Sequence, residues 1–226
     1  MAPRGQAQTQ QGELKSMKNS MIRYILNMSS KKTPIKSADI VRKCLQGEQK
    51  MFVRLLPEVQ DILSDVYGYQ LNEIKEKTGK CYLVTTELTG QSAANLTVNQ
   101  REELRLLFIV LSYIFMKGGK VMEAVLFGFL KKLDIEEEPH EYFGNFRTLI
   151  TEPFVKQMYL KKEKIEMENT NMDDKFEYSW GPRADLEFNK KDCLEWVAKI
   201  MKKPASSFVK QWNECQSEDE DVEMEE

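Results

Sequence analysis

Apolar side chains recur at helical spacing along the first 70 residues and predict three helices. Near the N-terminus, most apolar positions fall within one arc of roughly 100° when successive residues advance about 100° around a helix axis. Lys31-Lys32-Thr33-Pro34 ends this helix, and Ala38 to Leu45 is predicted as the second. The third is predicted from about Glu48 to Tyr67, with Gly68 as its C-terminal glycine and a kink or break at Pro57.

Two apolar residues of the first predicted helix lie outside its main stripe. Ile22 and Leu26 fall roughly 60° to 100° beyond the edge of the arc, on a flank that the helix does not need for its own core. We therefore expect this flank to be available to a partner.

After Gly68 the pattern changes from helical to alternating. Tyr69 to Ile74 and Cys81 to Thr85 predict two strands joined by a turn at Thr78-Gly79-Lys80. Three helices followed by a hairpin make a winged helix. Residues 90–99 (GQSAANLTVN) are polar and are typical of a linker between domains.

The same order of elements is predicted again after the linker. The elements are helices at 104–116, 121–133 and 142–151, strands at 154–160 and 175–180, and a last helix at about 186–202. Gly118-Gly119 separates the first two helices, and the polar residues 161–174 join the two strands.

The predicted fold class is therefore mainly α with small β-hairpins, in two tandem winged-helix domains. The domains cover residues 13–89 and 100–203, and the linker covers 90–99. Residues 1–12 are predicted to be a disordered N-terminus, and residues 204–226 an acidic disordered tail.

The aromatic stretch FEYSWGPR ends the second predicted hairpin. Phe176, Tyr178 and Trp180 alternate along a strand, and Gly181-Pro182 turns the chain into the last helix. Trp180 is interpreted as a core side chain. Arg183 is interpreted as a surface or capping arginine, with a binding role as the alternative.

Charge is distributed unevenly along the chain. The formal net charge is -3, but residues 217–226 hold seven acids and no base. The candidate DNA-binding residues lie at the turn before the second helix and along it, where a winged helix can meet phosphates: Lys31, Lys32, Lys36, Arg42 and Lys43. A solvated basic face explains them about as well. The acidic tail either keeps the chain soluble or shields this basic face.

DNA binding by this segment is expected to be independent of sequence. The third helix offers no base-reading set of Arg, Asn or Gln, and Asp61 and Asp65 would repel the groove.

Residues that could carry catalysis or bind a metal are sparse. His140 is the only histidine and lies in a polar run, while Gly118-Gly119-Lys120 lacks the frame of a phosphate-binding loop. The run Glu136-Glu137-Glu138 lacks the alternating ligands of a calcium loop, and no two cysteines form a CxxC pair. We predict no catalytic residue, no metal and no cofactor.

The chain is also expected to act away from membranes. Its longest apolar run, 104–116, is interrupted by Arg105 and is too short to cross a bilayer. Residues 1–13 lack the apolar stretch of a secretory signal, so a reducing compartment with free cysteine thiols is expected.

At the end of the second hairpin the sequence becomes similar to a known family. YSWGPRA (178–184) resembles the wing-to-helix signature of the MAGE (melanoma antigen) homology domain. PIKSADIV (34–41), YLVTTEL (82–88), MKGGKV (116–121) and RTLITEPFVKQMYL (147–160) resemble further family segments in the same order. The resemblance covers about residues 13–202. It implies two consecutive winged helices, which agrees with the repeat predicted from periodicity.

Within the family, the basic first half is most similar to the branch that provides the third non-SMC element of the Smc-five/Smc-six complex, which acts in chromosome maintenance and DNA repair. That resemblance implies a non-catalytic, chromosome-associated nuclear subunit. Such a subunit docks a RING-type ubiquitin ligase, contacts a kleisin subunit and helps the complex, with its two large ATPases, to hold DNA.

The resemblance and the apolar pattern of the chain together predict where the partners bind. The family's two-leucine motif on the first helix is Ile25-Leu26 here, so the RING partner is expected at Ile22, Ile25 and Leu26. The kleisin is expected at the first helix of the second domain, at Leu107, Phe108 and Leu111, where apolar residues are almost continuous. Burial of that helix against the first domain is the alternative.

Two functional hypotheses follow. The first is an assembly and ligase-adaptor subunit, and the second is a stand-alone winged-helix DNA-binding protein acting in transcription. Co-purification with a RING protein, a kleisin and the coiled-coil ATPases would favour the first.

Overall fold

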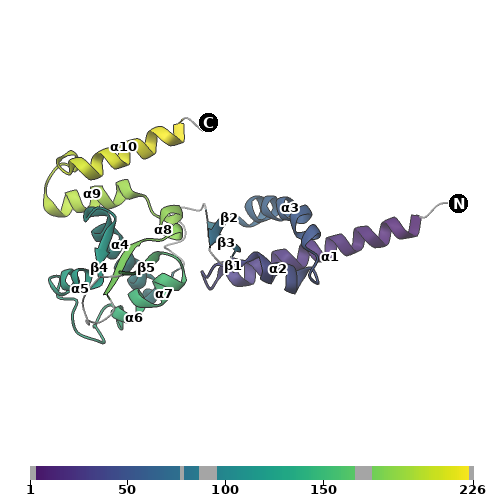
Figure 1. Ribbon diagram of the computed structural model, residues 1–226, viewed down its shortest axis with the longest axis horizontal. Coiled ribbons are helices and arrows are strands. Elements are labelled where there is room, and N and C mark those ends of the chain that lie inside the picture. The colour runs from purple at the N-terminus through teal and green to yellow at the C-terminus, as the bar shows by residue number, and fades with distance from the viewer. Residues whose placement is uncertain (1–3, 77–78, 87–95, 166–174, 224–226) are drawn as a thin grey trace. The chain divides into compact units, whose positions relative to one another are not determined.

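The computed structural model describes residues 4–76, 79–86, 96–165 and 175–223 of the 226-residue chain. Its internal contacts divide the chain into two units, Met1–Ala94 and Asn95–Glu226 (Figure 1). The boundary falls within residues 90–99, the predicted linker, of which residues 90–95 lie outside the described residues.

The first unit has the element order of a winged helix. Its elements are α1 (Arg4–Ser29), β1 (Ile35–Lys36), α2 (Ser37–Cys44), α3 (Gln49–Tyr67), β2 (Tyr69–Glu76) and β3 (Gly79–Thr86). The three strands form an antiparallel sheet in the order β1-β3-β2, with Leu71 opposite Val84. Apolar residues from α1, α2, α3 and the sheet form one core, which includes Ile25, Ile40 and Leu63, all with no exposed surface.

Helix α3 continues through Pro57, where a kink or break was predicted. Leu55 and Val59 are buried on either side of the proline, and burying each such side chain is worth about 1.5 to 3 kcal/mol, which offsets the lost backbone hydrogen bond. The predicted end is confirmed. Gly68 adopts the left-handed conformation (φ 65°), which glycine reaches without a Cβ clash.

The second unit repeats this order and, in its described residues, adds four α-helices, one before its hairpin and three after it. Its elements are α4 (Val98–Met116), β4 (Lys120–Met122), α5 (Glu123–Lys131), α6 (Phe146–Thr151), α7 (Pro153–Lys156), β5 (Leu160–Ile165), β6 (Lys175–Trp180), α8 (Pro182–Glu187), α9 (Lys190–Met201) and α10 (Val209–Glu223). Its sheet has the order β4-β6-β5 and is also antiparallel. The two sheets and the surrounding helices confirm the predicted mainly α fold of tandem winged helices.

One predicted strand was placed too early. Residues 154–160 were expected to be extended, but Pro153–Lys156 forms α7 and the strand starts only at Leu160. Proline at the first helical position favours a helix start, and Phe154 is buried on that turn. Met158 then takes a left-handed conformation (φ 65°) and redirects the chain into β5.

Both predicted disordered ends contain helix. Helix α1 reaches back to Arg4, and α10 covers residues 209–223 of the expected tail. The first turn of α10 is fixed because the Gln211 amide donates to the Met116 carbonyl at 3.0 Å. Cys215 is 4% exposed and packs with Cys193, so this segment adds to the core of the second unit.

Candidate interaction surfaces

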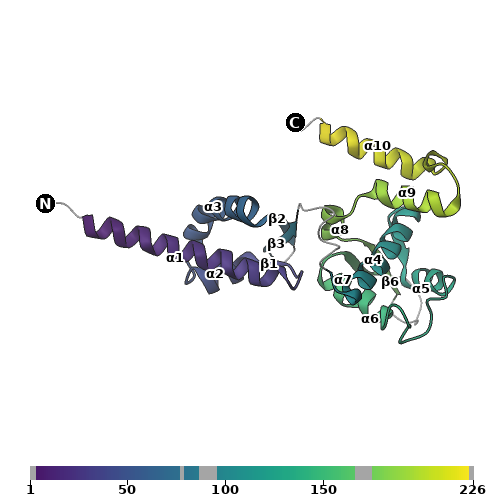
Figure 2. The ribbon, with the colours of Figure 1, turned by 180° about the vertical axis from the view of Figure 1, so that it is seen from behind.

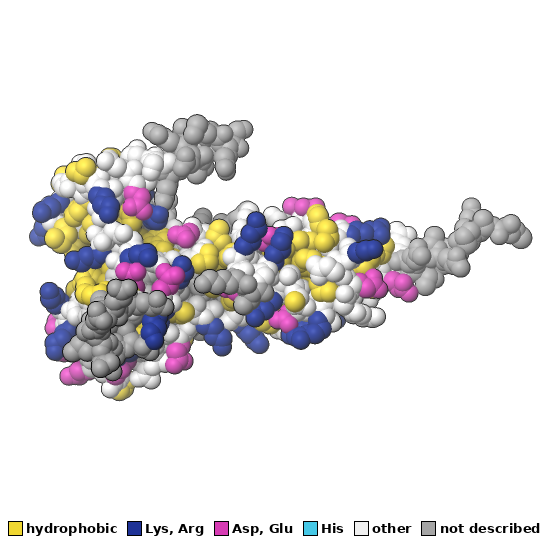
Figure 3. All heavy atoms as spheres, in the orientation of Figure 1, with side chains coloured by type: hydrophobic (Ala, Val, Ile, Leu, Met, Phe, Trp, Pro, Cys, Tyr) yellow, Lys and Arg dark blue, Asp and Glu magenta, His cyan; other side chains and the backbone are white. Residues whose placement is uncertain are grey.

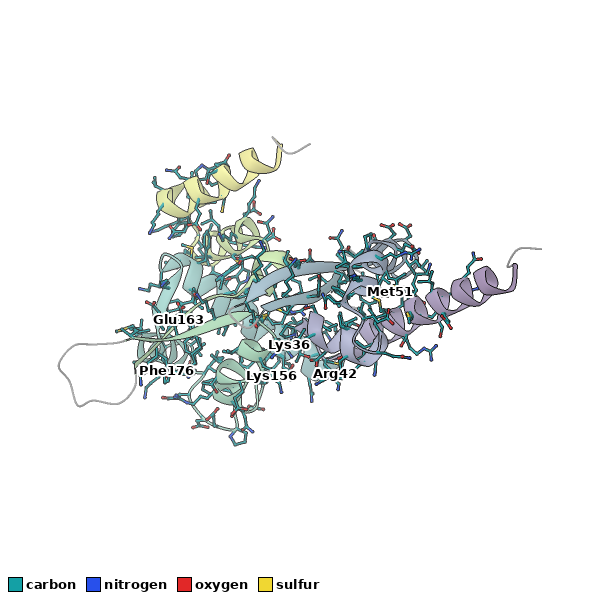
Figure 4. All side chains as sticks on the ribbon, turned by 45° about the vertical axis from the view of Figure 1, so that its right-hand side comes forward. Lys36, Arg42, Met51, Lys156, Glu163 and Phe176 are labelled. Atoms are coloured by element: carbon teal, nitrogen blue, oxygen red, sulfur yellow. The ribbon has the colours of Figure 1, made fainter. Side chains whose placement is uncertain are left out.

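The basic segment predicted to bind DNA is largely exposed in the first unit, with Lys32 half-buried and its other four residues exposed. Lys36 comes from β1 and Arg42 from α2, as labelled in Figure 4, and Lys31 follows α1. Arg42 donates to the Asp39 carboxylate at 2.6 Å, yet its side chain remains 73% exposed. Lys43 donates to the Tyr24 hydroxyl at 3.1 Å and lies 4.9 Å from its ring centre. These contacts stay on the surface and leave the positive charges available to phosphates.

The apolar flank predicted on the first helix is mostly covered. Ile22 is 8% exposed and Ile25 is fully buried, while only Leu26 is partly exposed. The expectation that Ile22 lies on an exposed flank is wrong, because α2 and α3 both pack against α1 and the core covers more than one face of the helix. Of the residues predicted for the RING partner, Leu26 is the one a partner can reach.

The residues predicted to bind the kleisin are also largely buried. Leu107 is 1% exposed and Leu111 has no exposed surface, because both lie in the main core of the second unit. Phe108 is partly exposed and packs edge-on against Trp196, with ring centres 5.2 Å apart. The apolar residues of α4 are therefore used inside their own unit, so this helix has no apolar surplus at Leu107 or Leu111.

A different apolar surface is open on the second unit. Met122, Val125 and Leu133 are 39%, 41% and 46% exposed, and they recur at helical spacing along α5 and its ends. Phe129 of the same stripe stacks on Tyr113 of α4, with ring centres 3.7 Å apart and planes 5° from parallel. We call these five residues the α5 surface.

Sequence reasoning did not single out the α5 surface. Residues 121–133 were predicted only as a helix, with no partner assigned to them. The available signal was that α5 (EAVLFGFLK) is apolar on almost every side, more than a helix that packs on one core needs.

Arg183 in the aromatic stretch is not a surface arginine, but it does cap a helix end, because it donates to the carbonyl of Gln157, the residue that ends α7. Its side chain is 1% exposed, and its guanidinium donates to the Glu187 carboxylate at 2.6 Å and to the Gln157 carbonyl at 2.9 Å. Tyr159 donates to the other oxygen of the same carboxylate. Burial first, and then the Glu187 charge, raise the pKa of the Tyr159 hydroxyl well above its usual value, so the hydroxyl keeps its proton.

The rest of that stretch forms the turn that the sequence predicted. The Trp180 indole is partly buried and donates to the Leu111 carbonyl at 2.9 Å. Gly181 precedes α8, and Pro182 is the first residue of that helix. This cluster joins the second hairpin to α8 and holds both against α4.

The candidate chemical groups have structural roles. The His140 Nδ1 accepts hydrogen bonds from the backbone N–H groups of Tyr142 and Phe143, each at 3.1 Å, and so closes a turn. Burial raises the pKa of the Cys193 thiol to about 11, which disfavours the thiolate that nucleophilic chemistry needs. Across residues 4–76, 79–86, 96–165 and 175–223, no three His, Cys, Asp or Glu residues form a group that could hold a metal ion.

None of the helices in the described parts of the chain has the length and apolar character to cross a membrane. The prediction that the chain is not an enzyme stays a prediction.

Comparison with known proteins assigns the family. A family model described as the MAGE homology domain matches residues 21–191, which span both units. The chain belongs to the MAGE homology domain family. The resemblance seen in the sequence segments is thereby confirmed.

Relatives within the MAGE family differ in how much of their length this chain spans. The human non-structural maintenance of chromosomes element 3 homolog is 33% identical over 222 residues, which cover 97% of this chain and 70% of that protein. Human MAGE-like protein 2 is 34% identical over 210 residues, which cover 90% of this chain but only 16% of that protein.

A solved structure shows the same arrangement of elements. A chain of the Nse1-Nse3-Nse4 complex is similar to this MAGE chain with a TM-score of 0.81 and 33% sequence identity. The match covers 91% of this chain and 99% of that chain.

Proposed function

We propose that this MAGE-family chain is a non-catalytic, nuclear subunit of the Smc-five/Smc-six chromosome-maintenance complex. The observation that carries the proposal is the extent of similarity to one kind of relative. The chain matches 70% of the human element 3 homolog and 99% of a chain in the Nse1-Nse3-Nse4 complex, but only 16% of MAGE-like protein 2. A shared domain alone would give a match like the one to MAGE-like protein 2, in which this chain covers only a small part of the relative.

In this role the chain binds a RING-type ubiquitin ligase subunit, a kleisin subunit and, through the complex, the two ATPases. We place the RING contact at Leu26 and its surroundings on α1, since Ile22 and Ile25 support the core. We place the kleisin contact at the α5 surface, where an amphipathic helix can cover exposed Val125 and Leu133. Leu107 and Leu111 would support this contact from the core, whereas Phe108 packs on Trp196 of α9.

Two single substitutions should separate these contacts. Leu26→Asp should weaken RING binding by roughly tenfold to a hundredfold and leave kleisin binding intact, because it places a charge where an apolar side chain of this size contributes about 1.5 to 3 kcal/mol. Val125→Asp should do the reverse. The measurement is co-purification of the full chain with both partners, quantified by titration calorimetry, with circular dichroism to verify folding.

Each variant serves as the control for the other. Loss of both partners in one folded variant, or retention of both in either, would contradict the placement of the surfaces. The competing hypothesis, a stand-alone DNA-binding protein acting in transcription, would be supported by chromatin association in cells that lack the RING and kleisin partners. Helix α3 argues against this competing hypothesis. It is the helix that would read bases, and its exposed Asp61 and Asp65 would repel the DNA groove.

We propose that the basic segment of the first unit gives the complex a weak, sequence-independent contact with DNA. The contact uses charge alone, so log K should fall against log salt with a slope of about -2.7 to -4.5 for three to five phosphate contacts. Reversing Lys31, Lys32 and Lys36 to Glu should weaken binding and flatten that slope. Fluorescence anisotropy on two unrelated duplexes at several salt concentrations measures both effects.

The matched control reverses Lys131, Lys132 and Arg147 in the second unit. If this control variant loses DNA affinity while the first-unit variant binds like the parent, the DNA contact lies in the second unit instead.

A further inference from the structure

The end of α9, the start of α10 and the residues between them are strongly basic. Residues 196–213 hold no Asp or Glu and four lysines: Lys199, Lys202, Lys203 and Lys210. All four side chains are exposed, and none forms an ion pair with any residue that the structure describes. We call these four residues the basic turn.

Exposed apolar side chains lie among these lysines. Ile200 is 57% exposed, Met201 54% and Val209 64%, which are among the most exposed large apolar side chains of the chain. In Figures 1 and 2 α9 and α10 lie side by side, so the start of α10 is near the end of α9. Figure 3 shows basic and apolar side chains together at this end of the second unit.

The backbone of the basic turn is firmly held. At the end of α9, the Lys203 N–H donates to the Ala198 carbonyl at 3.0 Å, and the Lys202 N–H donates to Lys199 at 3.2 Å. At the start of α10, Gln211 donates to the Met116 carbonyl at 3.0 Å. The apolar side chains are therefore presented to solvent by a fixed scaffold.

Lys202 occupies a position that favours glycine. Its φ and ψ of 52° and 41° lie in the left-handed region, where a side chain is disfavoured. A lysine at this helix end is thus costly for folding, while it adds one more positive charge to the turn.

We propose that the basic turn, with Ile200, Met201 and Val209, is a docking surface for an acidic peptide segment that carries interspersed apolar residues. The lysines match its carboxylates, and the three apolar side chains match its apolar residues. A DNA backbone would satisfy the lysines but would leave the apolar side chains without a matching surface. This surface lies apart from Leu26 and the α5 surface in the sequence, and it does not depend on either partner proposed above.

The test uses two labelled peptides of equal charge and the full chain. The probe EEDLEMLEDE combines acids with apolar residues, and the control peptide EEDSESSEDE carries serine in their place. Fluorescence anisotropy should give an affinity for the probe several-fold higher than for the control. The variant K199E/K202E/K203E should lower the affinity for the probe by roughly tenfold or more. The matched variant K156E/K161E/K164E reverses three lysines elsewhere in the same unit and should bind like the parent.

Lys202→Gly separates binding from folding. Glycine removes one charge and relieves the left-handed conformation, so this variant should melt at a higher temperature while it binds the probe two- to threefold more weakly. If Lys202 had only a structural role, the melting temperature and the affinity for the probe would both rise in this variant.

Three results would overturn the proposal. Equal affinity for the two peptides would show that the turn attracts charge without selecting apolar residues. Equal losses in both triple variants would show that net charge, and not this surface, governs binding. Tighter binding of a duplex DNA of equal charge, lost only in K199E/K202E/K203E, would make the turn a nucleic-acid contact.

Discussion

Replacing Arg183 by Ala should lower the free energy of unfolding of the second unit by about 3 kcal/mol, because it empties a buried site and removes the hydrogen bonds that the guanidinium donates. The guanidinium is 1% exposed and contacts both the Glu187 carboxylate and the Gln157 carbonyl. Without it, the Glu187 carboxylate, whose side chain is 21% exposed, keeps the hydrogen bond from the Tyr159 hydroxyl. Urea unfolding followed by tryptophan fluorescence measures the loss.

Tryptophan fluorescence reports on the second unit alone. The three tryptophans of the chain, Trp180, Trp196 and Trp212, all lie in that unit. The control is Lys131→Ala in the same unit, which removes an ion pair with Glu136 of similar length, 2.8 Å, but at the surface. Solvent screens that pair, so its loss should leave the unfolding midpoint nearly unchanged. Equal effects of the two substitutions would contradict the role given to burial.

Replacing Gly181 by Ala should destabilise the second unit by about 3 kcal/mol, near the upper end for overpacking a closed site. A Cβ at this position would lie 2.3 Å from the Met158 carbonyl oxygen and 2.8 Å from its carbon. The backbone cannot easily move apart, because the Gly181 N–H donates to the Tyr159 carbonyl at 2.8 Å and the Arg183 N–H donates to the Met158 carbonyl at 3.0 Å. Urea unfolding followed by tryptophan fluorescence measures this loss of stability as well.

Gly128→Ala is the matched control for Gly181→Ala. Gly128 lies inside α5, and an added Cβ would meet nothing within 4 Å. Alanine there should stabilise the helix by about 0.5 to 1 kcal/mol. Two glycine-to-alanine changes in one unit are thus expected to have opposite signs. A stable Gly181→Ala variant would show that the hairpin and α8 are not packed as closely as the structure indicates.

Local patterns were sufficient for most of the elements. The change from helical to alternating spacing after Gly68 predicted the first hairpin, and the repeat of the same order predicted a second winged helix. The short strands β1 and β4 were missed because two or three residues carry no period. They become strands only because β3 and β6 offer them backbone partners.

The candidate interaction surfaces were less predictable than the fold. The exposed basic residues of the first unit were identified correctly as surface residues, because charge itself keeps a side chain in water. Most of the apolar residues predicted to bind partners are buried, and for the same reason in both units. Ile22, Leu107 and Leu111 were chosen as surplus apolar residues, and each is covered by other elements of its own unit.

The sequence by itself determined most of the helices, the two hairpins, their repetition and the family, because periodicity, turn residues and short motifs are local. Only the tertiary structure decided which apolar residues are exposed, that Arg183 is buried against Glu187, and that residues 209–217 pack on α4 and α9. The reason is physical. A helix shows from its own sequence which face is apolar, but the coverage of that face depends on side chains that arrive from distant parts of the chain.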